Sequence, residues 1–216
     1  MITVLNEKTS VFNQFLSEIR DINIQKDKMR FRRNLERMGE IMAYEISKKI
    51  NFKDTEIQTP LGVSVCKTID KQPVIASIMR AGLPLHQGFL NYFDNAENSF
   101  ISAYRKYNKN DGFDIKLEYL STPDLTGKTL ILVDTMLATG ASVVLAYKAL
   151  LKNGTPQKTY IVSLIASNEG VEYLKKNLSQ KNTKIFLGAI DNELTAHSYI
   201  VPGLGDAGDL AYGEKQ

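Results

Sequence analysis

Leu130-Ile-Leu-Val-Asp134-Thr-Met-Leu-Ala-Thr139-Gly140-Ala-Ser142 is the stretch that decides the fold. A continuous apolar run reads as a strand buried on both faces, an acid stands at its carboxyl end, and a short turn leads into a helical segment. Other apolar runs have the same character, at 73–79, 159–165 and 183–190, and helical stretches lie between them at 83–93, 142–153 and 168–178. This alternation predicts an α/β domain whose mostly parallel, twisted sheet is flanked by helices.

Two segments interrupt this alternation. Residues 27–50 read as a long helix, because apolar residues recur there at three- and four-residue steps and no proline intervenes. We expect a single domain, with an N-terminal helical arm over 1–54 and an α/β core over 55–216. Two β-prone runs flank an Asp-Gly pair at 111–112, which predicts a protruding β-hairpin at about residues 99–120 and a candidate lid.

Composition excludes several classes of protein. The chain has 216 residues, 43% of them hydrophobic, and its 27 basic and 24 acidic side chains give a net charge of +3. Such values are typical of a folded globular protein. The single cysteine, Cys66, allows no internal disulfide, and with only two histidines a structural zinc site is not supported. No signal peptide or membrane-spanning run is present, so we expect no membrane association and a cytoplasmic location.

The basic residues between Lys26 and Arg37 could indicate nucleic-acid binding. However, Asp27, Glu36 and Glu40 are interleaved with them. We interpret this stretch as a solvated helix face and expect no nucleic-acid partner.

The turn after the strand at 130–134 has the chemistry of a phosphate site. Gly140 allows main-chain N–H groups to converge, Thr139 and Ser142 add hydroxyl donors, and the helix that follows contributes partial positive charge. Asp134 suits ribose hydroxyls or a hydrated Mg²⁺ rather than phosphate. From this motif alone, a capped helix after a buried strand is an equally good interpretation. The usual nucleotide-binding loop, Gly-x-x-x-x-Gly-Lys-Ser/Thr, is absent.

A second glycine-rich segment, Ile200-Val-Pro-Gly-Leu-Gly205-Asp-Ala-Gly208-Asp, lies close to the carboxyl end. It contains Gly-x-Gly-x-x-Gly, but too little chain follows for the βαβ unit and the distant acid of a dinucleotide fold. Glycines can instead bring main-chain groups close to a flat ligand. A base such as uracil, with two carbonyl acceptors and one N–H on its edge, fits such a loop.

Segments 77–83, 134–142 and 199–209 together resemble, in order and spacing, the motifs of the uracil phosphoribosyltransferase family. The resemblance covers nearly the whole chain and implies a type I phosphoribosyltransferase-like fold. It also implies that uracil and 5-phospho-α-D-ribose 1-diphosphate are converted to UMP and diphosphate, with Mg²⁺ bound mainly through the substrate diphosphate rather than by protein ligands.

The family pattern assigns roles to individual positions. Arg80, Arg105 and Asp134 would be catalytic, and Ile200, Gly205, Asp206 and Ala207 would bind uracil. The phosphoribosyl diphosphate would be bound by Arg80, Arg105, Asp134, Thr135, Met136, Leu137, Ala138, Thr139, Gly140, Ala141, Ser142 and Asp206. Two positions depart from the pattern: Thr135 stands where the family usually has Pro, and Ala141 replaces a common Gly, which is tolerable only at negative φ.

Two other functions stay open. One is a non-catalytic uracil- or nucleotide-sensing regulator that binds RNA through residues 26–37. The other is a purine phosphoribosyltransferase, which the missing second acid at Thr135 and the loop at 205–207 disfavour. We also expect a homodimer or a larger homo-oligomer, because Met and Phe positions of the arm helix are expected to be exposed. GTP is a candidate activator because it activates some relatives.

Overall fold

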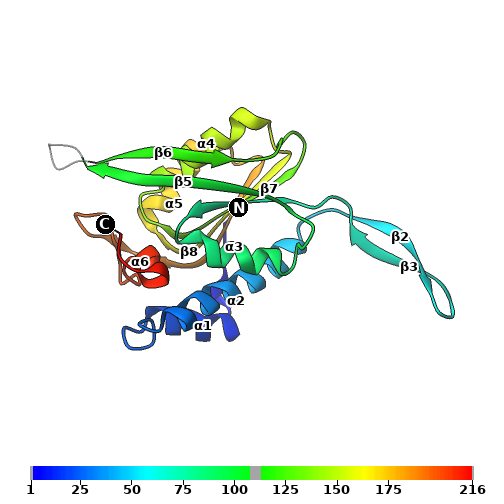
Figure 1. The fold of residues 1–216 in the computed structure, drawn as a ribbon, viewed down its shortest axis with the longest axis horizontal. Coiled ribbons are helices and arrows are strands. Elements are labelled where there is room, and N and C mark those ends of the chain that lie inside the picture. The colour runs from blue at the N-terminus through cyan, green and yellow to red at the C-terminus, as the bar shows by residue number, and fades with distance from the viewer. Residues whose placement is uncertain (1, 108–112, 216) are drawn as a thin grey trace.

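The computed structural model describes residues 2–107 and 113–215, with side chains at all of these except 103–107 and 113–116. Its centre is a seven-stranded sheet in the order β1-β9-β8-β7-β4-β5-β6, in which only β6 runs antiparallel to its neighbour (Figure 1). The strands are β1 (Ile2–Val4), β4 (Val74–Met79), β5 (Glu97–Tyr107), β6 (Phe113–Ser121), β7 (Thr129–Leu137), β8 (Lys158–Ser167) and β9 (Thr183–Asp191). The predicted fold class is confirmed.

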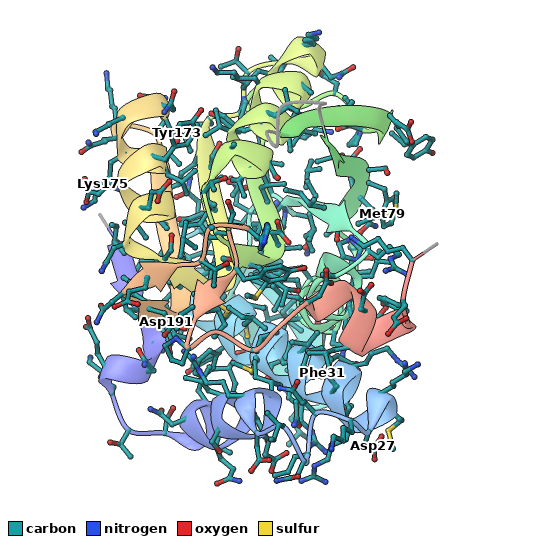
Figure 2. All side chains as sticks on the ribbon, turned by 90° about the vertical axis from the view of Figure 1, so that its left-hand side faces the viewer. Asp27, Phe31, Met79, Tyr173, Lys175 and Asp191 are labelled. Carbon is teal, nitrogen blue, oxygen red and sulfur yellow. The ribbon has the colours of Figure 1, made fainter. Side chains whose placement is uncertain are left out.

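Helices cover both faces of this sheet (Figures 1 and 2). On one face lie α1 (Val11–Arg20), α2 (Lys28–Ser47) and α3 (Gly82–Leu90); on the other lie α4 (Ala141–Leu150) and α5 (Asn168–Asn177). The strands between these layers are apolar on both faces, as a buried parallel sheet requires. Each predicted crossover helix is present, with its ends shifted by a few residues.

The long helix predicted at 27–50 is α2. The Asp27 side chain caps it by accepting a hydrogen bond from the Arg30 main-chain N–H at 3.0 Å. Phe31, Met38 and Met42 are fully buried in the core shared with the sheet, so the expectation that the Met and Phe positions of this helix are exposed is wrong for these residues. Figure 2 shows Phe31 on this helix. The arm is therefore a layer of the core.

Two hairpins extend from the body. The predicted one is formed by β5 and β6, and its turn at 108–112 lies outside the described residues. The other, formed by β2 (Phe52–Thr59) and β3 (Gly62–Ile69), was not predicted, and the expected boundary at 54/55 falls within β2. It projects far from the body (Figure 1), and its side chains are mostly exposed.

Short elements complete the chain: η1 (Leu5–Glu7), η2 (Leu151–Asn153), β10 (Glu193–Leu194), β11 (Ile200–Val201) and α6 (Ala207–Tyr212). None of the described helices is sufficiently long and apolar to span a bilayer.

Candidate active site

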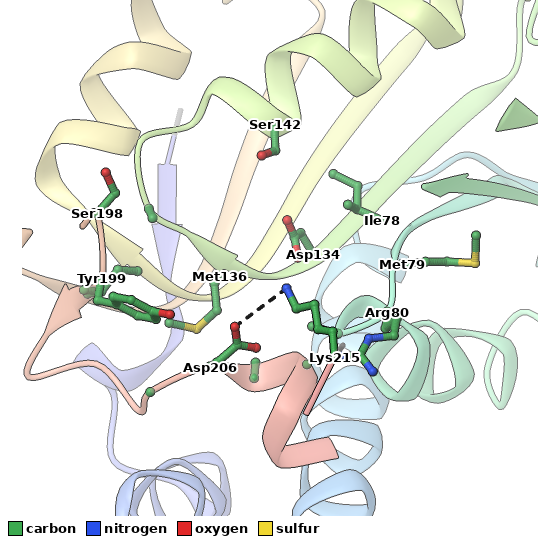
Figure 3. Close-up of a pocket in the computed structure, with 16 residues that line it drawn as sticks. Ile78, Met79, Arg80, Asp134, Met136, Ser142, Ser198, Tyr199, Asp206 and Lys215 are labelled. Carbon is green, nitrogen blue, oxygen red and sulfur yellow. Dashed lines mark ion pairs between the residues drawn. The ribbon is translucent and has the colours of Figure 1, made fainter. Parts of the chain in front are cut away.

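A pocket of about 460 Å³ opens at the carboxyl ends of β4 and β7 (Figure 3). Three segments that are far apart in sequence line it: residues 78–81 after β4, residues 134–142 from β7 into α4, and residues 198–208. Strands of a parallel sheet end at one edge, and loops that follow them meet there. The three sequence motifs therefore converge on one cavity.

Residues of β7 alternate between the pocket and the protein interior. Asp134, Met136 and Ala138 line the pocket, whereas Thr135 and Leu137 are fully buried and point away. This is the two-residue period of a strand. Thr135 and Leu137 could therefore contact substrate only through their main-chain atoms. Their assigned role in binding the phosphoribosyl diphosphate stays a prediction.

The turn into α4 is built on Gly140. Its φ of +79° is left-handed, which glycine adopts without strain, and a side chain there would also meet the Gly170 carbonyl at 3.0 Å. Gly140 is the N-cap, and Ala141 starts the helix without positive φ. The methyl group of Ala141 is therefore accommodated. Ser142 lines the pocket from the first turn of α4, whereas the side chains of Thr139 and Ala141 do not line it.

Asp134 is half-buried at the base of the pocket. Loss of hydration raises the pKa of its carboxyl to about 7, against the opposing effect of hydrogen bonds from the Thr135 and Met136 main chain. A carboxyl that changes charge near neutral pH in a cleft is typical of a functional site.

Arg80 lies on the loop between β4 and α3. Its Nη2 donates to Asp209 Oδ1 at 2.9 Å and its Nη1 donates to the Gly213 carbonyl at 3.2 Å, so the arginine is joined to α6 and the tail that follows it. The loop passes close to β7: a side chain at Gly82 would lie 2.8 Å from Ser77 Oγ and 3.2 Å from the Val133 carbonyl. Only glycine fits this approach. The Met79–Arg80 peptide is cis.

The glycine-rich loop is held from outside the pocket. Arg20 of α1 forms a two-pronged ion pair with Asp191 at the end of β9, with both N–O distances 2.8 Å, and also donates to the Gly203 carbonyl at 3.0 Å. Asp191 in turn accepts from the Gly203 N–H at 2.9 Å. We call Arg20 and Asp191 the loop clamp. Figure 2 shows Asp191 near the N-terminal helices.

Each predicted base-binding residue lies on this loop. Ile200, Gly205, Asp206 and Ala207 all line the pocket, and Gly205 has a φ of +95°. Asp206 caps α6 by accepting from the Asp209 N–H at 3.0 Å. The Val201–Pro202 peptide is cis. The loop is therefore held by the cap on α6, by the loop clamp and by the pairing of β11 with β10.

The position of Arg105 relative to the pocket stays a prediction. Its main chain is in β5, and its side chain lies outside the described residues, as does that of its neighbour Lys106. Its assigned role stays a prediction.

Sequence reasoning missed several residues of the site. The loop clamp joins positions 171 residues apart, and no local pattern indicates such a pairing. Tyr199 and Lys215 also line the pocket. Tyr199 adjoins the recognised loop and could have been included, whereas Lys215 stands in a tail that has no motif of its own.

Comparison with known proteins identifies the family. The sequence pattern of the family described as uracil phosphoribosyltransferase matches residues 6–214. A uracil phosphoribosyltransferase of Porphyromonas gingivalis is 55% identical over 211 residues, covering 98% of this chain and 97% of that protein. One of Pyrococcus furiosus is 34% identical over 213 residues, covering 96% and 88%. A solved structure of an Aquifex aeolicus protein matches with a TM-score of 0.87 at 29% identity, covering 99% and 98% of the two chains. This chain belongs to the uracil phosphoribosyltransferase family.

Proposed function

We propose that this protein transfers a phosphoribosyl group from 5-phospho-α-D-ribose 1-diphosphate to uracil in pyrimidine salvage, forming UMP and diphosphate. The observation that carries the proposal is the meeting of three segments in one pocket: the Arg80 loop, the turn at 134–142 and the glycine-rich loop. Each suits a different part of the two substrates. Family membership supports the same reaction.

The chemistry needs stabilisation of a leaving anion. The bond between ribose C1 and the diphosphate oxygen breaks, a bond from uracil N1 to C1 forms, and N1 loses its proton. Positive charge develops on the ribose while negative charge grows on diphosphate. Arg80, and Arg105 by family pattern, would stabilise that negative charge. The turn at 139–142 would bind the 5-phosphate, and Asp134 would accept hydrogen bonds from the ribose hydroxyls.

The pocket fits a metal ion that is held mainly by substrate oxygens. Asp134 and Asp206 both line it, but among the side chains described, at residues 2–102 and 117–215, no three His, Cys, Asp or Glu are grouped to hold a metal ion. Mg²⁺ on the diphosphate would neutralise part of the charge of the leaving group. Asp134 and Asp206 are the side chains placed to accept hydrogen bonds from its water ligands.

The contacts of three arginines in the arm helix count against the RNA-binding alternative. Arg30 pairs with Glu18, a contact that lowers the pKa of that carboxyl to about 2, and Arg33 pairs with Glu36 and Glu40. The Arg32 guanidinium donates to the Ala211 carbonyl at 2.7 Å. Basic side chains that are already paired do not form an open surface for phosphates.

The proposal extends to assembly and regulation. The β2–β3 hairpin carries exposed apolar side chains: Leu61 is fully exposed, and Val63 and Val65 are more than half exposed. Such a projecting apolar surface suits association with a second copy of the chain. GTP activation is proposed from the family resemblance alone, and measuring the rate with and without GTP tests it. The cytoplasmic location stays a prediction from the sequence.

The direct test is to incubate the purified protein with uracil, the phosphoribosyl diphosphate and Mg²⁺, and to measure UMP by chromatography. We expect UMP to form in step with consumption of uracil, and Arg80→Ala and Asp134→Ala to reduce the rate at least 100-fold. Absence of UMP from the wild-type protein would refute the proposal.

A further inference from the structure

Lys215 lines the active-site pocket from the C-terminal tail, although no motif includes it. Its Nζ lies 3.9 Å from Asp206 Oδ2, in an ion pair with the residue that caps α6. Figure 3 shows the lysine extending across the pocket from the tail, with Asp206 on one side and Arg80 on the other. The ammonium group is therefore already directed into the space that a substrate must occupy.

The second basic side chain that lines this pocket, Arg80, is occupied by protein partners. Asp209 offsets its charge at 2.9 Å, and the Gly213 carbonyl accepts a further hydrogen bond. Lys215 is bound less tightly, because 3.9 Å exceeds hydrogen-bond length and leaves its N–H groups available. Among the basic side chains described at the pocket, Lys215 is thus the one that can most readily exchange its protein partner for an incoming anion.

The position of the tail indicates which anion this is. Gly213, two residues before Lys215, is bonded to Arg80, and the preceding turn of α6 is fixed through Arg32. These contacts place Lys215 beside the loop at 79–81 and across the pocket from the turn at 139–142. Lys215 is therefore on the side of the pocket where Arg80 would bind the diphosphate, and not on the side of the turn that would bind the 5-phosphate.

We propose that Lys215 binds the diphosphate group of the phosphoribosyl donor as a second cation beside Arg80, exchanging its contact with Asp206 for an oxygen of the substrate. The inference rests on the proposed function and adds a substrate-binding residue to it. The same group becomes the leaving diphosphate, so Lys215 also binds that product.

The test compares Lys215→Ala and Lys215→Arg with the wild type and with Lys152→Ala, a control at an exposed lysine in η2 far from the pocket. For each protein, KM is measured for both substrates and inhibition constants for diphosphate and UMP. We expect Lys215→Ala to raise the KM for the phosphoribosyl donor and the inhibition constant of diphosphate about 5- to 30-fold, as for loss of one charge-assisted hydrogen bond. The KM for uracil and the inhibition constant of UMP should change less than about twofold. Lys215→Arg should bring the KM for the phosphoribosyl donor and the inhibition constant of diphosphate most of the way back to the wild-type values.

A binding measurement makes the result independent of turnover. Titration of each protein with Mg²⁺-diphosphate in a calorimeter should show the same loss of affinity in Lys215→Ala, and the loss should shrink as salt is raised. Unchanged diphosphate affinity in Lys215→Ala overturns the inference, as does an equal loss for UMP, which carries only the 5-phosphate. Failure of the wild type to form UMP would instead refute the proposed function.

Discussion

The Thr135 hydroxyl donates a hydrogen bond to the Ala81 carbonyl at 2.7 Å, across the gap between β7 and the loop that carries Arg80. Thr135 is fully buried. The family usually has proline at this position, and the ring of proline restricts the main-chain φ angle. Here a hydrogen bond ties the carboxyl-terminal part of β7 to the neighbouring loop, so the departure from the family pattern supplies a contact that proline cannot make.

Thr135→Val tests this contact, because valine has almost the same shape but no hydroxyl. The Ala81 carbonyl would lose its buried donor, and we expect the free energy of unfolding to fall by about 1–2 kcal/mol. The KM for the phosphoribosyl donor should rise several-fold because the Arg80 loop is less well positioned, while the KM for uracil stays constant. Thr135→Ser keeps the hydroxyl and is the matched control. Equal kinetics in the valine and serine variants would show that the bond does not position the loop.

Asp134 predicts a pH dependence of activity. With a pKa raised to about 7 by burial, the carboxylate needed for the ribose hydroxyls is lost as the pH falls through that value. The rate constant kcat/KM should therefore decline below about pH 7, and Asp134→Asn should be nearly inactive at every pH. A kcat/KM that stays constant from pH 8 to pH 5 would contradict the assignment.

The same carboxyl predicts a pH dependence of stability. Its pKa is higher in the folded state than its ordinary value of 3.8, so between about pH 4 and pH 7 the folded protein binds more protons than the unfolded chain. The contribution of Asp134 to stability therefore falls as the pH rises through this window. Denaturant titration should give Asp134→Asn a free energy of unfolding about 1–3 kcal/mol higher than that of the wild type at pH 8. At pH 4 the two free energies should be equal. If the difference in free energy of unfolding between the variant and the wild type grew toward low pH, the raised pKa of Asp134 would be contradicted.

The loop clamp predicts a selective effect on the base. Asp191→Asn weakens the ion pair with Arg20 but keeps a side chain of the same size beside the Gly203 N–H. We expect the KM for uracil to rise about tenfold with little change for the phosphoribosyl donor, together with a loss of about 1–3 kcal/mol in the free energy of unfolding. Arg33→Ala, which removes a surface ion pair with Glu36, is the control and should leave both KM values unchanged. A parallel rise in both KM values in Asp191→Asn would indicate general damage to the pocket.

The projecting hairpin predicts the assembly. Replacing both Val63 and Val65 by Glu places charges on the exposed apolar surface without touching the core, so the fold should persist while the oligomer dissociates. Light scattering gives the mass of each species. Met29→Glu makes the same change at the exposed methionine of α2, where sequence reasoning placed the interface, and should leave the assembly intact. Dissociation by Met29→Glu alone would place the interface on that helix.

The sheet and the three pocket segments are predictable from the sequence because their signals are local. Buried parallel strands appear as continuous apolar runs, and Gly140 and Gly205 mark turns that need left-handed φ. Contacts between distant segments leave no such signal. The Arg20–Asp191 pair and the Thr135–Ala81 bond depend on how helix and loop pack on the sheet, and the sequence pattern alone contains neither.

The β2–β3 hairpin shows a different reason for failure. Its strands lie outside the main sheet and expose both faces, so they lack the continuous apolar runs by which the buried strands are recognised. The expectation that the methionines of α2 are exposed is wrong for Met38 and Met42 for a related reason. Periodicity identifies the apolar stripe of α2, but it cannot tell whether that stripe packs on the same chain or on another, and the structure shows that Met38 and Met42 pack on the sheet of their own chain.

A competition assay among three bases tests whether the loop at 200–207 selects uracil. The protein is given the phosphoribosyl donor, Mg²⁺ and equal concentrations of uracil, hypoxanthine and adenine, and the nucleotides formed are separated and quantified. We expect UMP, with IMP and AMP at background. Formation of IMP or AMP at a rate comparable with that of UMP would show that the loop does not select uracil.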